Sequence, residues 1–137
     1  DIAAVVDPTV SPEQRLRNGA LTVFEFVGAH AEQWKRFFLE PPAHGELPAA
    51  AVDSVREHAV DQLVVMFQQA MEESGLSLEL AREIRPQVYI FIGGVESLAR
   101  WWVDHLDEAT PELLTLRVVN QSWLGFGNML EGKWLGP

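Results

Sequence analysis

The chain has 137 residues, enough for one domain with a buried core. Apolar residues make up 47% and charged residues 22%, which is typical of a globular domain rather than a disordered segment. The net charge of −10 argues against nucleic-acid binding by these residues, because an acidic surface repels phosphate. The absence of cysteine excludes disulfides, thiol catalysis and thiolate metal sites. No membrane span or signal peptide is apparent, so we expect a cytoplasmic protein.

The first helix has a clear start signal. Residues 1–10 look like a tail or the end of a linker helix, and a domain of residues 11–137 follows. Ser11 is a helix N-cap, Pro12 suits the first helical position, and Gln14 occupies the capping-box position. Gly28 is expected to end this helix, and a short second helix is predicted near residues 31–39. The apolar face of the first helix comprises Leu16, Ala20, Val23, Phe24 and Val27.

A long helix follows the loop at residues 41–45. We expect it to begin at Pro48 and to end near Ser74, with Gly75 as its C-terminal stop. Its predicted apolar stripe comprises Val52, Val55, Ala59, Leu63, Met66, Phe67, Ala70 and Met71.

Residues 87–106 are predicted to form the central helix. Ser77 caps the segment 78–85 before it, and Pro86 either kinks the helix or separates two segments. A strand over residues 88–92 is the weaker interpretation, because the helical period continues past the glycines. The helix has one broad apolar stripe and a second one beside it. It is therefore either buried inside a monomer or faces a partner subunit.

The last helix is predicted over residues 111–130, after the cap sequence Thr110-Pro111-Glu112. No charged residue lies between Arg117 and Glu131, and the helix again has two apolar faces. The first face comprises Leu116, Val119, Trp123, Phe126 and Leu130. All predicted elements are helices joined by short loops, so the fold class is all-α, a bundle of about five to six helices.

Glycines inside the last two long helices suggest close packing. Gly93, Gly94, Gly125 and Gly127 each cost about 1 kcal/mol relative to alanine in a helix interior. They mark either local helix breaks or the close approach of another helix. With the surplus apolar faces, the second alternative predicts a dimeric four-helix bundle around a two-fold axis. The expected interface comprises Ile90, Gly94, Trp101, Leu114, Val118, Ser122, Gly125 and Met129.

Several segments carry a family resemblance. They are residues 11–16, residues 26–34, the segment Phe91–Trp102 and Thr110–Leu113. In these segments and in helix order the chain resembles the C-terminal ligand-binding and dimerisation domain of TetR-type transcriptional regulators. The resemblance implies a homodimer and a cavity for a small hydrophobic or aromatic effector. It further implies a probable repressor whose DNA-binding helix-turn-helix would lie before Asp1.

The pocket walls implied by this resemblance are mainly apolar, with a few polar groups, as is usual for ligand sites. They comprise Phe24, Trp34, Leu63, Met66, Phe67, Tyr89, Ile92, Glu96, Asn120 and Trp123. The other interpretation of Glu96 is an intrahelical pair with Arg100.

Enzymatic signatures are missing from the sequence. It has no nucleophile elbow, P-loop, dinucleotide fingerprint or zinc-protease motif, so we expect neither catalysis nor a cofactor. His58 and Asp61 share a helix face but do not suffice for a metal site. The alternative function is an all-helical protein–protein adaptor dimer, which would have no small-molecule cavity.

Overall fold

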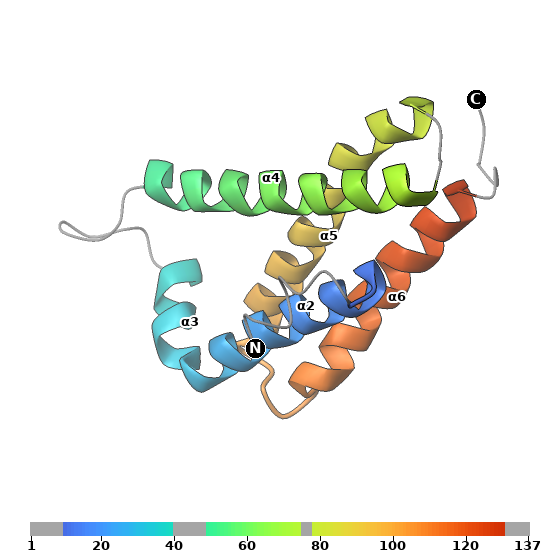
Figure 1. Ribbon diagram of the computed structural model, residues 1–137. Coiled ribbons are helices and arrows are strands. Elements are labelled where there is room, and N and C mark those ends of the chain that lie inside the picture. Colours follow the sequence, from blue (N-terminus) through green and yellow to red (C-terminus); the bar gives the residue numbers. More distant parts are fainter. Residues whose placement is uncertain (1–9, 40–48, 75–77, 131–137) are drawn as a thin grey trace.

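The computed structural model describes residues 10–39, 49–74 and 78–130 (Figure 1). These residues contain five helices and no strand, which confirms the all-α prediction. The expected tail, the loop at 41–45, Pro48, Gly75 and Ser77 lie outside the described residues. The helices are α2 (Pro12–Ala29), α3 (Ala31–Leu39), α4 (Ala49–Ser74), α5 (Leu78–Trp102) and α6 (Pro111–Leu130).

Two predicted helix starts are confirmed by their capping hydrogen bonds. The Ser11 hydroxyl accepts a hydrogen bond from the Gln14 backbone N–H at 3.2 Å. At the start of α6, the Thr110 hydroxyl accepts one from the Leu113 N–H, also at 3.2 Å. Each side chain satisfies one of the N–H groups that a helix N-terminus leaves without an intrahelical partner.

Helix α5 decides between the two alternatives at Pro86: it runs through the proline as one helix, not as two segments. Its C-terminal end differs from the prediction, because the helix ends at Trp102 and not near Leu106. The proline ring is exposed, so it is accommodated without displacing a packed neighbour. At the other end the chain turns because the Trp102 indole N–H donates to the Ala109 carbonyl at 2.8 Å. This bond fastens the connection to α6 against the end of α5.

Two helix pairs form the frame of the molecule. Helix α2 packs chiefly on α6, α4 packs chiefly on α5, and α5 also packs on α6 (Figure 1). Helix α4 has few contacts with α2. The largest fully buried side chains come from α2, α4, α5 and α6: Phe24, Val60, Ile84, Val88 and Val119.

Some apolar stripes are rotated relative to their predictions. Val55, placed on the apolar stripe of α4, is 72% exposed, whereas Val60 and Val64 are buried. Leu116, placed on the first apolar face of α6, is 42% exposed. The reason is that each of these helices has more apolar positions than one neighbour covers. The face that is buried therefore depends on where the neighbouring helix packs.

Candidate functional site

A groove with a volume of about 990 Å³ lies between α2, α4 and α5, and Trp34 of α3 contributes to its wall. Its surface is mainly apolar and it is open to solvent on one side. The volume is at the upper end of what small-molecule sites usually offer. Its apolar walls include Leu63 and Met66 of α4 and Phe91, Ile92 and Val95 of α5.

The groove exists because α2 and α4 are both attached to other helices rather than to each other. Apolar side chains on the two helices are consequently left without cover. Val23 and Phe26 of α2 are 43% and 55% exposed, and Val55 and Val65 of α4 are 72% and 50% exposed. All four line the groove. Burial of this surface by an apolar ligand would be favourable in proportion to the area removed from water.

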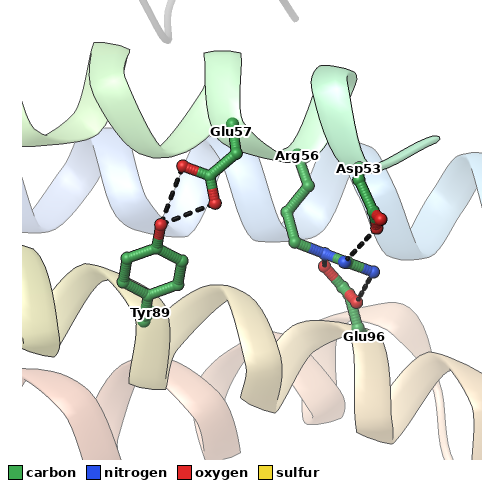
Figure 2. Close-up of polar contacts among 5 residues, drawn as sticks. All are labelled: Asp53, Arg56, Glu57, Tyr89 and Glu96. Atoms are coloured by element: carbon green, nitrogen blue, oxygen red, sulfur yellow. Dashed lines mark hydrogen bonds and ion pairs between the residues drawn. The ribbon is translucent and has the colours of Figure 1, made fainter. Parts of the chain in front are cut away.

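A charged cluster crosses the groove wall between α4 and α5 (Figure 2). The Arg56 guanidinium donates two hydrogen bonds to the Glu96 carboxylate, at 2.6 and 2.8 Å, and a third to Asp53 at 3.0 Å. The hydrogen bond to Glu96 is the main cause of a raised Arg56 pKa, so the guanidinium stays charged. Both Arg56 and Glu96 line the groove, and Glu96 pairs across helices with Arg56.

Two further polar contacts tie α4 to α5. The Tyr89 hydroxyl donates to the Glu57 carboxylate, whose two oxygens lie 2.6 and 2.8 Å away (Figure 2). This hydrogen bond raises the pKa of Tyr89 above its ordinary value. Arg85 donates to Asp61 at 2.8 Å. The position of α4 beside the groove is therefore set by three polar contacts in addition to the buried Val60 and Val64.

The structure brings half of the predicted ligand-binding residues together. Trp34, Leu63, Met66, Ile92 and Glu96 all line the groove. Leu63, Phe67 and Trp123 line a separate void of about 20 Å³. A void of that size has room for about one water molecule, not for an effector.

The remaining predicted ligand residues lie away from the groove. Phe24 is fully buried and packs edge-on against Trp102, with ring centroids 6.4 Å apart. Tyr89 is exposed and bonded to Glu57 of α4, and Asn120 is exposed on α6; neither lines the groove. Periodicity identified these residues as apolar or polar but not which space they face.

Sequence reasoning missed several groove residues. They include Phe91 and Val95 of α5, the four exposed apolar residues of α2 and α4, and three arginines: Arg15, Arg56 and Arg100. One signal was present: α4 has valines at more positions than a single stripe requires. For the arginines there was no such signal, because a cation at a helix surface is ordinarily solvated.

The eight predicted interface residues differ in how far they are buried. Ile90, Trp101 and Gly125 are exposed. Leu114 and Val118 are buried within the chain, and the Val118 methyl would lie 3.2 Å from a Cβ added at Gly94. This close approach of helices at a glycine therefore occurs between α5 and α6 of one chain. Ser122 lines the small void, and the Met129 side chain lies outside the described residues.

The outer side of α5 and α6 carries additional apolar residues. Leu113, Leu116 and Leu124 of α6 are 37%, 42% and 65% exposed. On α5 the exposed residues Ile90, Ser97 and Trp101 are spaced so that they lie on the same face of the helix. An added Cβ at Gly93 or Gly125 would meet no atom within 4 Å. These positions leave room for another helix to approach.

Other kinds of site find little support in the described ranges. They contain no group of three or more side chains able to hold a metal ion. The ring of His58 lies 3.2 Å from the Gln62 amide nitrogen, and Asp61 is bound to Arg85. Among the same residues, no helix combines the length and apolar character that crossing a membrane requires.

Comparison with known proteins gives one family. The family described as tetracyclin repressor-like, C-terminal domain, matches residues 12–125. No curated protein and no solved structure matches the chain. The match extends from the start of α2 to the last turns of α6, so it spans all five helices and the groove. The chain therefore belongs to the family of tetracyclin repressor-like C-terminal domains.

Proposed function

We propose that the chain is the effector-binding and dimerisation domain of a TetR-type transcriptional regulator, with the groove as its effector site. The observation that carries the proposal is the apolar groove of about 990 Å³ between α2, α4 and α5 in a chain of this family. This is a family of regulatory domains rather than of enzymes. The groove also counts against the alternative of an adaptor dimer without a small-molecule cavity.

The proposed mechanism couples the groove to a subunit interface through α5. Helix α5 contributes Phe91, Ile92 and Val95 to the groove, and its exposed Ile90 and Trp101 are available for a second copy of the chain. An effector that binds one arrangement of α4 and α5 more tightly shifts the population toward it. In a dimer this shift changes the relative position of the two DNA-binding heads, and a repressor then releases or retains its operator.

Filling the groove tests the effector site. Ala59 lines the groove and is only partly buried, so Ala59→Phe occupies ligand space without removing a core side chain. The probe is N-phenyl-1-naphthylamine, a neutral aromatic dye that fluoresces when it is transferred from water to an apolar site. We expect Ala59→Phe to weaken dye binding about tenfold, which corresponds to roughly 1.4 kcal/mol.

The matched control is Gln68→Phe, which adds the same ring to an exposed position of α4 outside the groove. It should bind the dye as the unmodified chain does. Equal binding by Ala59→Phe and Gln68→Phe would show that the dye does not occupy the groove.

The DNA-binding part of the proposal is tested by the encoded residues upstream of Asp1. We expect about 50 residues that form three short helices with a basic recognition helix. An upstream sequence without that pattern would remove the DNA-binding role and leave an effector-binding dimer.

A further inference from the structure

The groove is richer in cations than the chain as a whole. The chain has a net charge of −10 and only 10 lysines and arginines. Among the described residues, three arginines and two carboxylates line the groove, and Asp53, which accepts a hydrogen bond from Arg56, places a third carboxylate beside it. The arginines are Arg15, Arg56 and Arg100, and the two lining carboxylates are Asp61 and Glu96. An acidic protein that concentrates cations in an apolar groove favours a ligand with negative charge there.

Two of the arginines flank one carboxylate. Glu96 and Arg100 are one helical turn apart on α5 and are therefore neighbours on its surface. Arg56 reaches Glu96 from α4 with a two-pronged contact. This planar geometry is the one in which arginine binds carboxylates in general. Glu96 thus occupies a position that another acidic group can fill with the same hydrogen bonds.

The acidic group of a ligand can displace the Glu96 carboxylate from Arg56 at a small cost in free energy. The Arg56 and Glu96 side chains are 37% and 40% exposed, so neither charge is held away from water. Ion pairs with that exposure contribute roughly 1 kcal/mol or less. A free Glu96 carboxylate regains its hydration, whereas the apolar part of an incoming ligand gains the burial that Val55, Phe26 and Ile92 offer.

We propose that the ligand of the groove is an amphipathic anion, an apolar or aromatic body with one acidic head, and that the head binds Arg56 in place of Glu96. A cationic ligand would have to approach Glu96 between Arg56 and Arg100. A neutral ligand would leave the Arg56 guanidinium paired with Glu96 and Asp53. This inference rests on the proposed effector site and names the chemical class that the site accepts.

The exchange has a consequence for the helices. The Arg56–Glu96 contact joins residues 40 positions apart in the chain and ties α4 to α5, as the Tyr89–Glu57 and Arg85–Asp61 contacts also do. When the acidic head of a ligand binds Arg56, that tie is lost, while the Tyr89–Glu57 tie remains (Figure 2). The Arg85–Asp61 tie remains as well. Occupancy of the groove is thereby transmitted to α5.

Two dyes with one skeleton test the inference on the full chain. They are 8-anilino-1-naphthalenesulfonate, which has a single anionic head, and the neutral N-phenyl-1-naphthylamine, which lacks it. We expect the anionic dye to bind about tenfold more tightly in spite of the chain's net charge, as a charge-assisted hydrogen bond implies. Arg56→Met should weaken the anionic dye about tenfold and leave the neutral dye unchanged. Glu96→Gln should strengthen the anionic dye, because a competing carboxylate is removed.

Tyr89→Phe is the matched control. It breaks another α4–α5 tie, and neither Tyr89 nor Glu57 lines the groove. It should leave the binding of both dyes unchanged; if it weakens the anionic dye as Arg56→Met does, Arg56 acts by holding the helices and the inference is wrong. Near-ultraviolet circular dichroism of each variant establishes that its tertiary packing is intact.

The remaining outcomes separate the inference from the proposed function. Equal affinities for the two dyes, both reduced by Ala59→Phe, would overturn the anionic ligand and keep the effector site. Tighter binding of the neutral dye, or weaker anionic binding in Glu96→Gln, would also overturn it. Binding of both dyes that Ala59→Phe does not change would instead remove the groove as the effector site.

Discussion

Gly28 shows how one small residue positions the core near the groove. An added Cβ at this position would lie 2.6 Å from a ring carbon of Trp102, closer than atoms can approach. Trp102 cannot move away easily, because it is buried, packs against Phe24 and donates its indole hydrogen to Ala109. The sequence suggested that Gly28 ends the first helix, whereas α2 continues to Ala29 and the glycine makes space for a ring.

Gly28→Ala should therefore destabilise the chain. We expect a loss of about 1–3 kcal/mol in the free energy of unfolding, as for other overpacked cores. The control is Gly19→Ala in the same helix, where an added Cβ meets nothing within 4 Å. There the better helix propensity of alanine should stabilise by up to about 1 kcal/mol. Urea unfolding measures both; equal effects would show that the Trp102 contact is unimportant.

Tyr89 provides a titration signal of the α4–α5 contact, because it is the single tyrosine of the chain. Its hydrogen bond to Glu57, with a smaller effect of burial, raises its pKa above the ordinary value of 10.0. The folded state therefore favours the neutral phenol. The contact stabilises the fold below about pH 10 and is lost as the pH rises through the raised pKa.

Absorbance at the wavelength of the phenolate follows this titration directly. We expect Glu57→Gln to lower the Tyr89 pKa toward its ordinary value, since the carboxylate that favours the neutral phenol is removed. Glu25→Gln, an exposed change on α2, controls for the general loss of one negative charge. An unchanged pKa in Glu57→Gln would show that the hydrogen bond is absent in solution.

At the scale of helices, α5 is continuous through a proline, a residue that disfavours helix. Pro86 lies well inside the helix, where proline removes a backbone hydrogen bond and crowds the preceding turn. The helix still runs through this position, because the residues on its buried side, among them Ile84 and Val88, are packed in the core. Tertiary packing here outweighs a local preference of about 3 kcal/mol.

Pro86→Ala should consequently raise stability. The side chain is exposed, so the change restores a hydrogen bond without opening a cavity. We expect a gain of about 1–3 kcal/mol in the free energy of unfolding. Ser97→Ala, at another exposed position of α5, should change it by less than about 1 kcal/mol. A destabilised Pro86→Ala variant would indicate that the proline is required by the packing of α5.

At the scale of the whole molecule, the exposed faces of α5 and α6 and the groove lie on different parts of the bundle. Ile90 and Trp101 do not line the groove, and Val55 and Val65 line it from α4. The two surfaces are proposed to serve two functions, subunit contact and effector binding. They should therefore be separable by substitution.

Ile90→Lys should shift the proposed dimer to a monomer, because it places a charge on the exposed outer side of α5, where Ile90 is 60% exposed. Val55→Lys, at a 72% exposed position of the groove, should leave the dimer intact and weaken binding of the neutral dye. Sedimentation velocity measures the mass of each variant. A dimeric Ile90→Lys variant would place the subunit contact elsewhere.

The structure indicates that Gly93, and not Gly94, is the glycine of α5 at which the proposed subunit contact can be tested. Gly94 faces Val118 of its own chain, so a bulky residue there would disturb the packing of α5 on α6 as well as any dimer. Gly93 has open space around its Cα and tests the outer side of α5 alone. Gly93→Trp is therefore a better test than a substitution of Gly94 of whether α5 forms the subunit contact.

The sequence by itself determined the helices, their order and the family. Capping signals at Ser11 and Thr110 and the apolar period act over a few residues, so they are readable without knowing the neighbours. Of the apolar groove walls in α4 and α5, the resemblance implied Leu63, Met66 and Ile92. The family match over residues 12–125 confirms the resemblance that these segments carry.

Only the tertiary structure decided which of two apolar faces is covered. Helix α4 packs chiefly on α5 and has few contacts with α2, so Val55 and Val65 face an open groove while Val60 and Val64 are buried. Arg56 and Glu96 are 40 residues apart and meet only because α4 crosses α5 at that point. The sequence of a helix with surplus apolar positions allows more than one of its faces to be buried. The packing of the complete bundle decides which face is covered.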